Sequence, residues 1–177
     1  CKGQSRRSFV PEEITYVDNK NGINLEVHTR LFPKRTRLMA EMENAFSDLF
    51  AQSQAVEIDG IRVYTMSDSQ HLLYLFFHYV KHFVYAGVGI RQLCDIMLFA
   101  EQKQDTICWE WIVEQVLKLK LERFWNALFA ICVHWLGMSV DKVHFVQRTE
   151  RSASLLKKKQ LEPLLQDIME GGAYGGS

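Results

Sequence analysis

An excess of charge of either sign is absent from the sequence, because its 21 Lys and Arg residues balance its 21 Asp and Glu residues. Such a balance leaves no net field to attract nucleic acid or an anionic membrane. No uncharged apolar run reaches the roughly 18 residues that a transmembrane helix needs. The first residues also lack the apolar core of a secretory signal peptide. We therefore expect a cytoplasmic protein without membrane contact, and we do not expect nucleic acid as a partner.

Cysteine is scarce, with four residues in the chain, and no two of them are spaced as Cys-x-x-Cys. The absence of closely spaced ligand pairs argues against a structural zinc site. Three of the four, Cys94, Cys108 and Cys132, lie in apolar helical patterns, and we expect them to be buried free thiols of a reducing compartment. The chain also begins at Cys1 without an initiator Met, so we expect it to be a segment of a longer protein.

Turn signals are present in the first third of the chain. An Asn-Gly pair separates residues 14–17 from 23–28, and an Asp-Gly pair lies within the apolar stretch 56–64. Both pairs supply the positive φ angles that two-residue hairpin turns require, so two β-hairpins are predicted. Within 23–28 the apolar residues alternate with polar ones. We expect the apolar side to face the core, with Glu26 and His28 on the polar side.

Helical spacing of apolar residues dominates from residue 67 onward. Helices are predicted from about 67 to 85, from about 90 to 102 and from 121 to 137. Between the last two, a further helix is predicted with Asp105 or Thr106 as its cap.

Proline marks two more helices. Pro33 can open a helix whose apolar spacing continues to Phe50. Pro163 lies inside a charged helix that is predicted to begin at Arg151, and it should kink or stop that helix. The glycine-rich residues 171–176 are expected to form a flexible tail.

Together these elements predict an α+β fold, in which a small antiparallel sheet of β-hairpins is followed by a C-terminal helical bundle. We divide the chain into 1–66, a β region with one helix, and 67–177, a helical half that carries most of the apolar residues. Trp125 is expected in the core of that half.

The stretch from residue 71 to 85 places polar and aromatic side chains on one stripe of its helix. Three histidines and two tyrosines there suit a polar cleft wall, a metal site or a phosphate-contacting surface, and the alternative is a half-exposed face whose histidines bond to carbonyls. His78 and His82, at i and i+4, could ligate one metal, although Tyr79 replaces the glutamate of His-Glu-x-x-His. The stripe consists of His71, Tyr74, His78, Lys81, His82 and Tyr85.

Arg91 and Asp95 are the two charges near the start of an otherwise apolar helix. An unpaired buried charge costs several kcal/mol, so each should be paired or part of a site. One interpretation is a buried Arg91–Asp95 bridge. Another is that Asp95 orients a histidine of the preceding helix.

Several soft motifs, in this order, resemble an uncharacterised bacterial nucleotidyltransferase-like family. The first is the strand Ile-Asn-Leu-Glu-Val-His, and the next is the helix that carries His78 and His82. The glycine-containing C-terminal end also looks like that of the family. The matching segments are 23–28, 72–82, 89–96, Trp109-Glu110 and 171–175, and Lys2-Gly3-Gln4-Ser5 resembles the start of the family.

This resemblance implies a polymerase-β-like nucleotidyltransferase fold. In such proteins two carboxylates of a Gly-x-Asp-x-Asp segment hold Mg²⁺ on a nucleoside triphosphate, and a third carboxylate on a later strand completes the site. Glu26 matches this third carboxylate, which implies a catalytic, metal-binding role. The resemblance also implies substrate-binding roles for a further set of residues, namely His28, His78, His82, Arg91 and Asp95.

The chain departs from the family in one respect, because no Asp-x-Asp occurs anywhere in it. Either that segment lies outside this chain or this version has lost catalysis. We therefore expect the chain alone to bind no Mg²⁺ observably and to transfer no nucleotide, while an intact family protein would use Mg²⁺ with a nucleoside triphosphate and an unknown acceptor. The alternative function is a non-catalytic binding module that docks a partner through its helical half.

Overall fold

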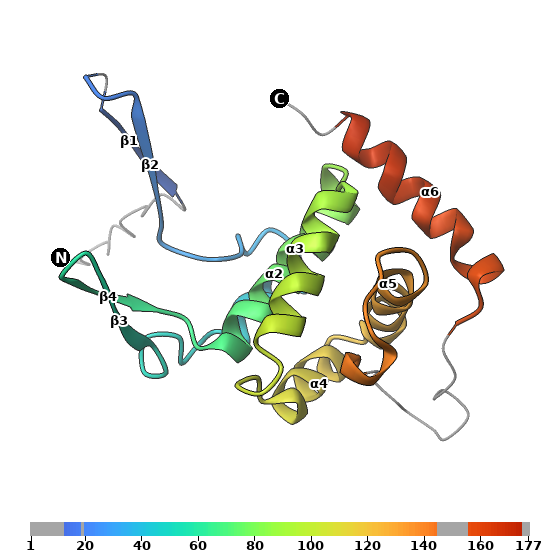
Figure 1. Cartoon of the computed structure of the whole chain (residues 1–177). Helices are drawn as coiled ribbons and strands as arrows, with labels where there is room; N and C mark the ends of the chain where they lie inside the picture. The colour runs from blue at the N-terminus through green and yellow to red at the C-terminus, as the bar shows by residue number, and fades with distance from the viewer. Residues whose placement is uncertain (1–12, 19, 145–155, 175–177) are drawn as a thin grey trace, which may run out of the picture. The chain divides into compact units, whose positions relative to one another are not determined.

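The computed structural model describes residues 13–18, 20–144 and 156–174. These residues form two antiparallel β-hairpins and six α-helices, which confirms the α+β fold (Figure 1). The chain divides into two compact units, Cys1–Ser47 and Asp48–Ser177. The division into 1–66 and 67–177 followed the change from hairpins to helices along the sequence, and it stays a prediction. The Lys-Gly-Gln-Ser start, the helix start expected at Arg151 and residues 175–176 lie outside the described residues.

The first unit begins with a hairpin of β1 (Glu13–Asp18) and β2 (Ile23–His28). Its turn is closed by the Asp18 carboxylate, which accepts hydrogen bonds from the Lys20 backbone N–H at 2.9 Å and from the Asn21 side-chain amide at 2.7 Å. Gly22 follows with φ +67°, a conformation that glycine adopts without steric cost. The first predicted hairpin is confirmed.

The apolar side of β2 is exposed, which corrects the expectation that it faces the core. Ile23 and Leu25 each keep 58% of their surface accessible, and Val27 keeps 40%. In the described residues this sheet has two strands only. Alternation along a strand shows which side chains share a face, but a second layer has to come from elsewhere in the fold.

The helix of the first unit, α1 (Arg37–Asn44), is shorter than predicted. It is capped by Thr36, whose Oγ1 accepts a hydrogen bond from the Met39 N–H, and so it begins four residues after Pro33. Turns replace the helix after Asn44, and Phe50 is 89% exposed. The predicted start at Pro33 and the apolar stripe reaching Phe50 are therefore wrong.

The second unit opens with the hairpin of β3 (Gln54–Ile58) and β4 (Ile61–Thr65). Asp59 and Gly60 have φ angles of 50° and 78°, the pair of positive values that a type I′ turn needs. The predicted Asp-Gly hairpin is confirmed.

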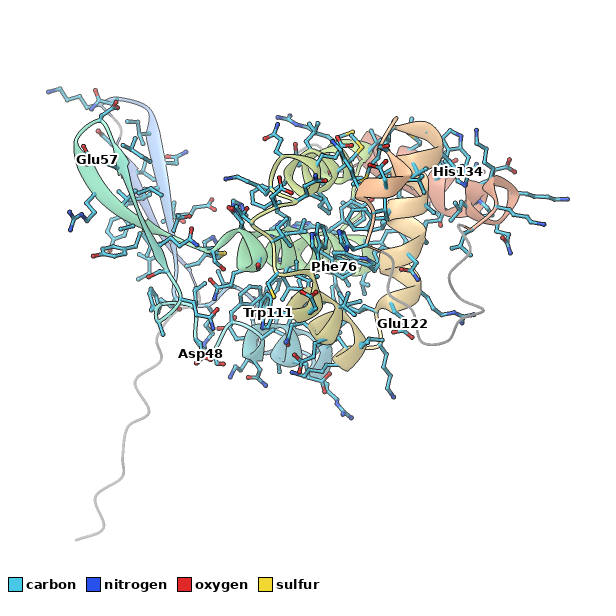
Figure 2. All side chains as sticks on the ribbon, turned by 60° about the horizontal axis from the view of Figure 1, so that its bottom comes forward. Asp48, Glu57, Phe76, Trp111, Glu122 and His134 are labelled. Atoms are coloured by element: carbon cyan, nitrogen blue, oxygen red, sulfur yellow. The ribbon has the colours of Figure 1, made fainter. Side chains whose placement is uncertain are left out.

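Five helices follow, and their helix–helix contacts build the main core. Within this bundle α2 packs against α3 and α4, and α5 packs against α3, α4 and α6. Figure 2 shows Phe76 among these helices and Glu57 on the hairpin of the same unit. The bounds are α2 Asp68–Tyr85, α3 Ile90–Gln102, α4 Trp109–Lys118, α5 Glu122–Trp135 and α6 Lys158–Tyr174, with a 3₁₀ turn at Val140–Lys142.

Trp125 is the largest fully buried side chain, as the sequence predicts. Its ring meets Phe76 edge-on with centroids 4.8 Å apart, and Phe129 lies 4.6 Å away on its own helix. These aromatic contacts add to the free energy gained from area burial. The helical half therefore supplies the main core of the second unit.

The last helix keeps Pro163 in its interior and includes Gly171. A Cβ built on Gly171 would lie 2.8 Å from the carbonyl oxygen of Val88, which places the backbone of α6 against the α2–α3 connection. The expectation that the glycine-rich end forms a flexible tail from residue 171 is thus wrong, because helix continues to Tyr174.

The three described cysteines differ in their surroundings. Cys132 is buried in α5, Cys94 is half-buried, and Cys108 is exposed at the start of α4. The expectation of three buried thiols therefore holds for Cys132, holds in part for Cys94 and is wrong for Cys108. Burial raises the pKa of the Cys132 thiol to about 12. Among the described residues, no helix is long and apolar enough to cross a bilayer.

Candidate functional site

Glu26 and His28 lie together on the polar face of β2. Residues two apart on a strand share a face, and His28 Nε2 is 3.8 Å from Glu26 Oε2. The side chain of Glu26 is 59% exposed, and that of His28 is 48% exposed. The cross-strand neighbour of Glu26 is Thr15, which adds no charge to this face. The carboxylate is therefore accessible, with a single imidazole as its described ionic partner.

A complete magnesium site is not formed by the described residues. Within 13–18, 20–144 and 156–174, no three His, Cys, Asp or Glu side chains are grouped so as to hold a metal ion. Carboxylate oxygens suit Mg²⁺, so Glu26 has the right chemistry for one ligand. The donors present do not make up the three-carboxylate set that the family resemblance implies.

The stripe on α2 is half-buried except for its exposed last member, Tyr85, and its imidazoles are arranged along one face. His78 and His82 have ring centroids 4.4 Å apart with an interplanar angle of 37°, and Tyr74 lies 5.5 Å from His78. His71, two turns earlier, lies against Phe99 of α3 at 4.6 Å. The stripe thus contains a close histidine pair and a separate histidine that packs on an aromatic ring.

Two of these imidazoles have a pKa below the ordinary histidine value. Burial lowers the pKa of His82, and the neighbouring Lys81 lowers it further. Burial also lowers the pKa of His71, although Asp68 opposes this effect. In the part of the chain that the structure describes, the His82 ring makes no hydrogen bond, so the expectation of carbonyl-bonded histidines does not hold there.

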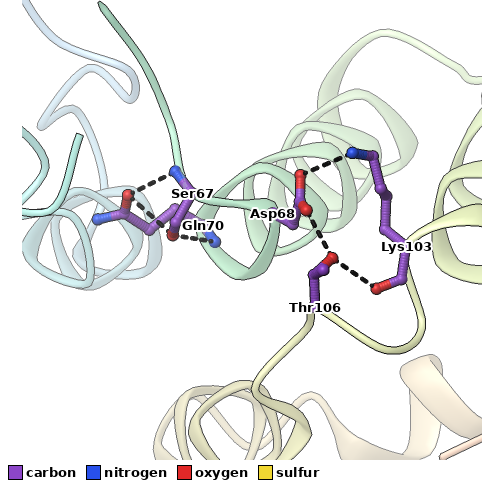
Figure 3. A network of polar contacts seen from close by, with 5 residues as sticks. All are labelled: Ser67, Asp68, Gln70, Lys103 and Thr106. Atoms are coloured by element: carbon purple, nitrogen blue, oxygen red, sulfur yellow. Dashed lines mark hydrogen bonds and ion pairs between the residues drawn. The ribbon is translucent and has the colours of Figure 1, made fainter. Parts of the chain in front are cut away.

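A polar network joins the start of α2 to the α3–α4 connection (Figure 3). The sequence did not predict this network. The Asp68 carboxylate accepts a hydrogen bond from Thr106 Oγ1 at 2.6 Å and lies 3.5 Å from Lys103 Nζ. Ser67 and Gln70 form a capping box beside it. Thr106 was predicted to cap α4, but Cys108 occupies that position. The Ser-x-x-Gln spacing was the one local signal of this network.

Arg91 and Asp95 are exposed on α3 and are not joined by an ion pair, so the prediction of a buried bridge is wrong. The buried residues of this helix fall on its other side. Both charges can therefore stay hydrated without a partner. The buried set is Leu93, Ile96, Met97 and Ala100.

The predicted site residues therefore fall into three groups. Glu26 and His28 are neighbours in the first unit, His78 and His82 are neighbours in the second, and Arg91 and Asp95 are separate exposed charges. Chemically, the first group offers an oxygen ligand, the second a pair of nitrogen ligands, and Arg91 a cation for an anionic group.

Comparison with known protein families gives a match over most of the chain. Residues 3–137 match a family model described as an uncharacterised nucleotidyltransferase. The matched segment includes both hairpins and α1 to α5, and it ends before α6. No curated protein and no solved structure matches the chain.

Proposed function

We propose, since this chain belongs to the family of uncharacterised nucleotidyltransferases, that it serves in the transfer of a nucleotidyl group from a nucleoside triphosphate to an acceptor. In that reaction an acceptor oxygen attacks the α-phosphorus and pyrophosphate leaves. The family match over residues 3–137 carries this proposal. Mg²⁺ dependence belongs to the proposal as well.

Glu26 is the carboxylate that we assign to the reaction centre. It lies on the polar face of β2 inside the matched segment, and its side chain is accessible. We assign His28, on the same face, to contacting the substrate or to orienting the carboxylate. Because the other carboxylates are absent from the described donors, the 177-residue chain should not catalyse transfer by itself.

The proposed substrate contacts in the second unit use nitrogen donors and one carboxylate. Arg91 is exposed and makes no ion pair with Asp95 in the described structure, which leaves its guanidinium available for phosphate oxygens. Asp95 lies one turn further along α3 and can accept a hydrogen bond from a hydroxyl group. His78 and His82 present imidazoles on α2.

The test begins with the full coding sequence of the gene, read for an Asp-x-Asp segment. Where that segment is present, Glu26→Gln in the whole protein should abolish Mg²⁺-dependent release of pyrophosphate from nucleoside triphosphates and leave the circular dichroism spectrum unchanged. Glu57→Gln is the matched control, because Glu57 is also an exposed strand carboxylate, paired across its hairpin with Arg62. The control should keep full activity.

Two results would overturn this proposal. Full activity of the Glu26→Gln protein would remove Glu26 from the reaction centre. A full gene without any Asp-x-Asp segment would leave the family fold without its catalytic carboxylates. The chain would then be a non-catalytic binding module that uses its helical half.

A further inference from the structure

The close histidine pair on α2 has a geometry that suits chelation. We propose that His78 and His82 together bind one divalent transition-metal ion of the zinc, nickel or copper class. This site is separate from the carboxylate chemistry proposed for Glu26, because imidazole nitrogens select these ions whereas Mg²⁺ prefers oxygen.

The distance between the two rings fits a shared ion. Residues at i and i+4 of a helix lie one above the other on one face, and the centroids of His78 and His82 are 4.4 Å apart. An ion bound by two imidazole nitrogens at about 2.1 Å each requires those nitrogens to lie within about 4 Å of each other. Binding of such an ion would therefore require both rings to turn a nitrogen toward the space between them.

The helix that carries the pair is held firmly from its other side. Phe76, Phe77, Tyr79 and Val80 are all buried, each with at most 4% of its surface exposed. A backbone fixed in this way presents both imidazoles at a constant spacing, so binding an ion requires little further ordering.

The nitrogens of the His82 ring make no hydrogen bond within the described structure. Burial lowers the pKa of His82, and Lys81 lowers it further, which favours the neutral imidazole that binds a metal. The positive charge of Lys81 works against a bound cation, which limits the affinity.

The proposed metal site of His78 and His82 leaves coordination positions unfilled by the described residues. No third His, Cys, Asp or Glu of the described residues joins the pair, so the remaining coordination positions are left to water or to an anionic ligand. Tyr79, at the position of the glutamate in His-Glu-x-x-His, is buried with 1% of its surface exposed and supplies a phenol in place of the carboxylate. The pair therefore does not form the hydrolytic site of that motif.

Titration of the full chain with Ni²⁺ by isothermal calorimetry tests the proposal, with His78→Gln, His82→Gln and the double variant alongside. We expect one ion per chain and, because chelation is lost with either ring, an increase in Kd of at least about tenfold in each single variant. The double variant should lose little more than a single one. His71→Gln is the matched control, being a half-buried histidine of the same stripe whose ring lies against Phe99, and it should change Kd by less than about twofold.

Different results would overturn the proposal. If the losses of affinity in the two single variants added up in the double variant, the histidines would form two independent single-histidine sites. A loss of affinity in His71→Gln as large as in the single variants would indicate non-specific binding. A wild-type chain that binds no more tightly than the double variant has no such site. Electron paramagnetic resonance of the Cu²⁺-loaded wild-type chain provides a second measurement that does not depend on the folding of a variant. It should show two coordinated nitrogens, and a single nitrogen would contradict chelation.

Discussion

Trp125 donates a hydrogen bond from its indole Nε1 to the backbone carbonyl of His144, with 2.9 Å between the two atoms. The same His144 stacks its ring on Trp109 of α4, with centroids 4.0 Å apart and planes within 10°. His144, which follows the 3₁₀ turn, thus contacts two tryptophans from different helices. The buried indole has a partner for its single polar atom, so its burial leaves no unsatisfied donor.

Trp125→Ala should lower the free energy of unfolding by about 3–5 kcal/mol, because it leaves a cavity between α2 and α5. Trp125→Phe retains an aromatic ring but loses the hydrogen bond to His144, and it should cost less. Urea titration followed by circular dichroism measures both. A loss below about 1 kcal/mol in the alanine variant would contradict the burial of Trp125.

Gly171→Ala should destabilise the protein even though alanine normally favours a helix over glycine by about 0.5–1 kcal/mol. The added Cβ would lie 2.8 Å from the Val88 carbonyl oxygen and 3.3 Å from its nitrogen, and both are backbone atoms. We expect a net loss of about 1–3 kcal/mol in chemical denaturation. Asp167→Ala, at an exposed position of the same helix, should be neutral or slightly stabilising. A gain in stability for Gly171→Ala would show that α6 does not approach Val88 in solution.

Arg91→Ala and Asp95→Ala should each change the free energy of unfolding by less than about 0.5 kcal/mol, because both side chains are exposed and do not pair with each other. The effects should add in the double variant. A double-mutant cycle by urea denaturation measures the coupling. A coupling free energy well above about 0.5 kcal/mol would indicate the buried bridge that the structure lacks.

Stability should fall as the pH is lowered below the ordinary histidine pKa of 6.5. Burial lowers the pKa of His71, His82 and His144 in the folded chain, so the folded state favours the neutral rings. Groups with a lowered folded pKa contribute stability above the unfolded pKa, and that contribution is lost as pH falls through the folded value. The urea midpoint should therefore decrease between about pH 7.5 and pH 5.5, and less so in His71→Gln. An equal decrease in this variant would mean that His71 does not contribute.

The local signals of the sequence were sufficient for much of the fold. The helix predicted at about 90–102 is α3, Ile90–Gln102, and the Asp-Gly turn has the expected φ angles. Alternation also placed Glu26 and His28 on one face, where they lie 3.8 Å apart. Each of these features depends on residues close together in the chain.

The features that the sequence did not reveal depend on distant contacts. Thr106 bonds to Asp68, 38 residues away, and therefore does not cap α4. Arg91 and Asp95 were placed inside because their helix is apolar, but its rotation turns them outward. The exposed apolar side of β2 has the same origin, since alternation cannot specify which layer, if any, covers a strand.

Cys108 and Cys132 give the second unit two thiols with very different access to reagents. The thiolate is the nucleophile in alkylation, and Cys108 is exposed whereas Cys132 is buried with its pKa raised. Alkylation of Cys108 therefore proceeds from the native state. Alkylation of Cys132 has to wait until α5 opens, so its rate measures how often the bundle opens. Mass spectrometry of the two peptides would then measure the rate of opening from the alkylation of Cys132, with the exposed Cys108 as the internal standard.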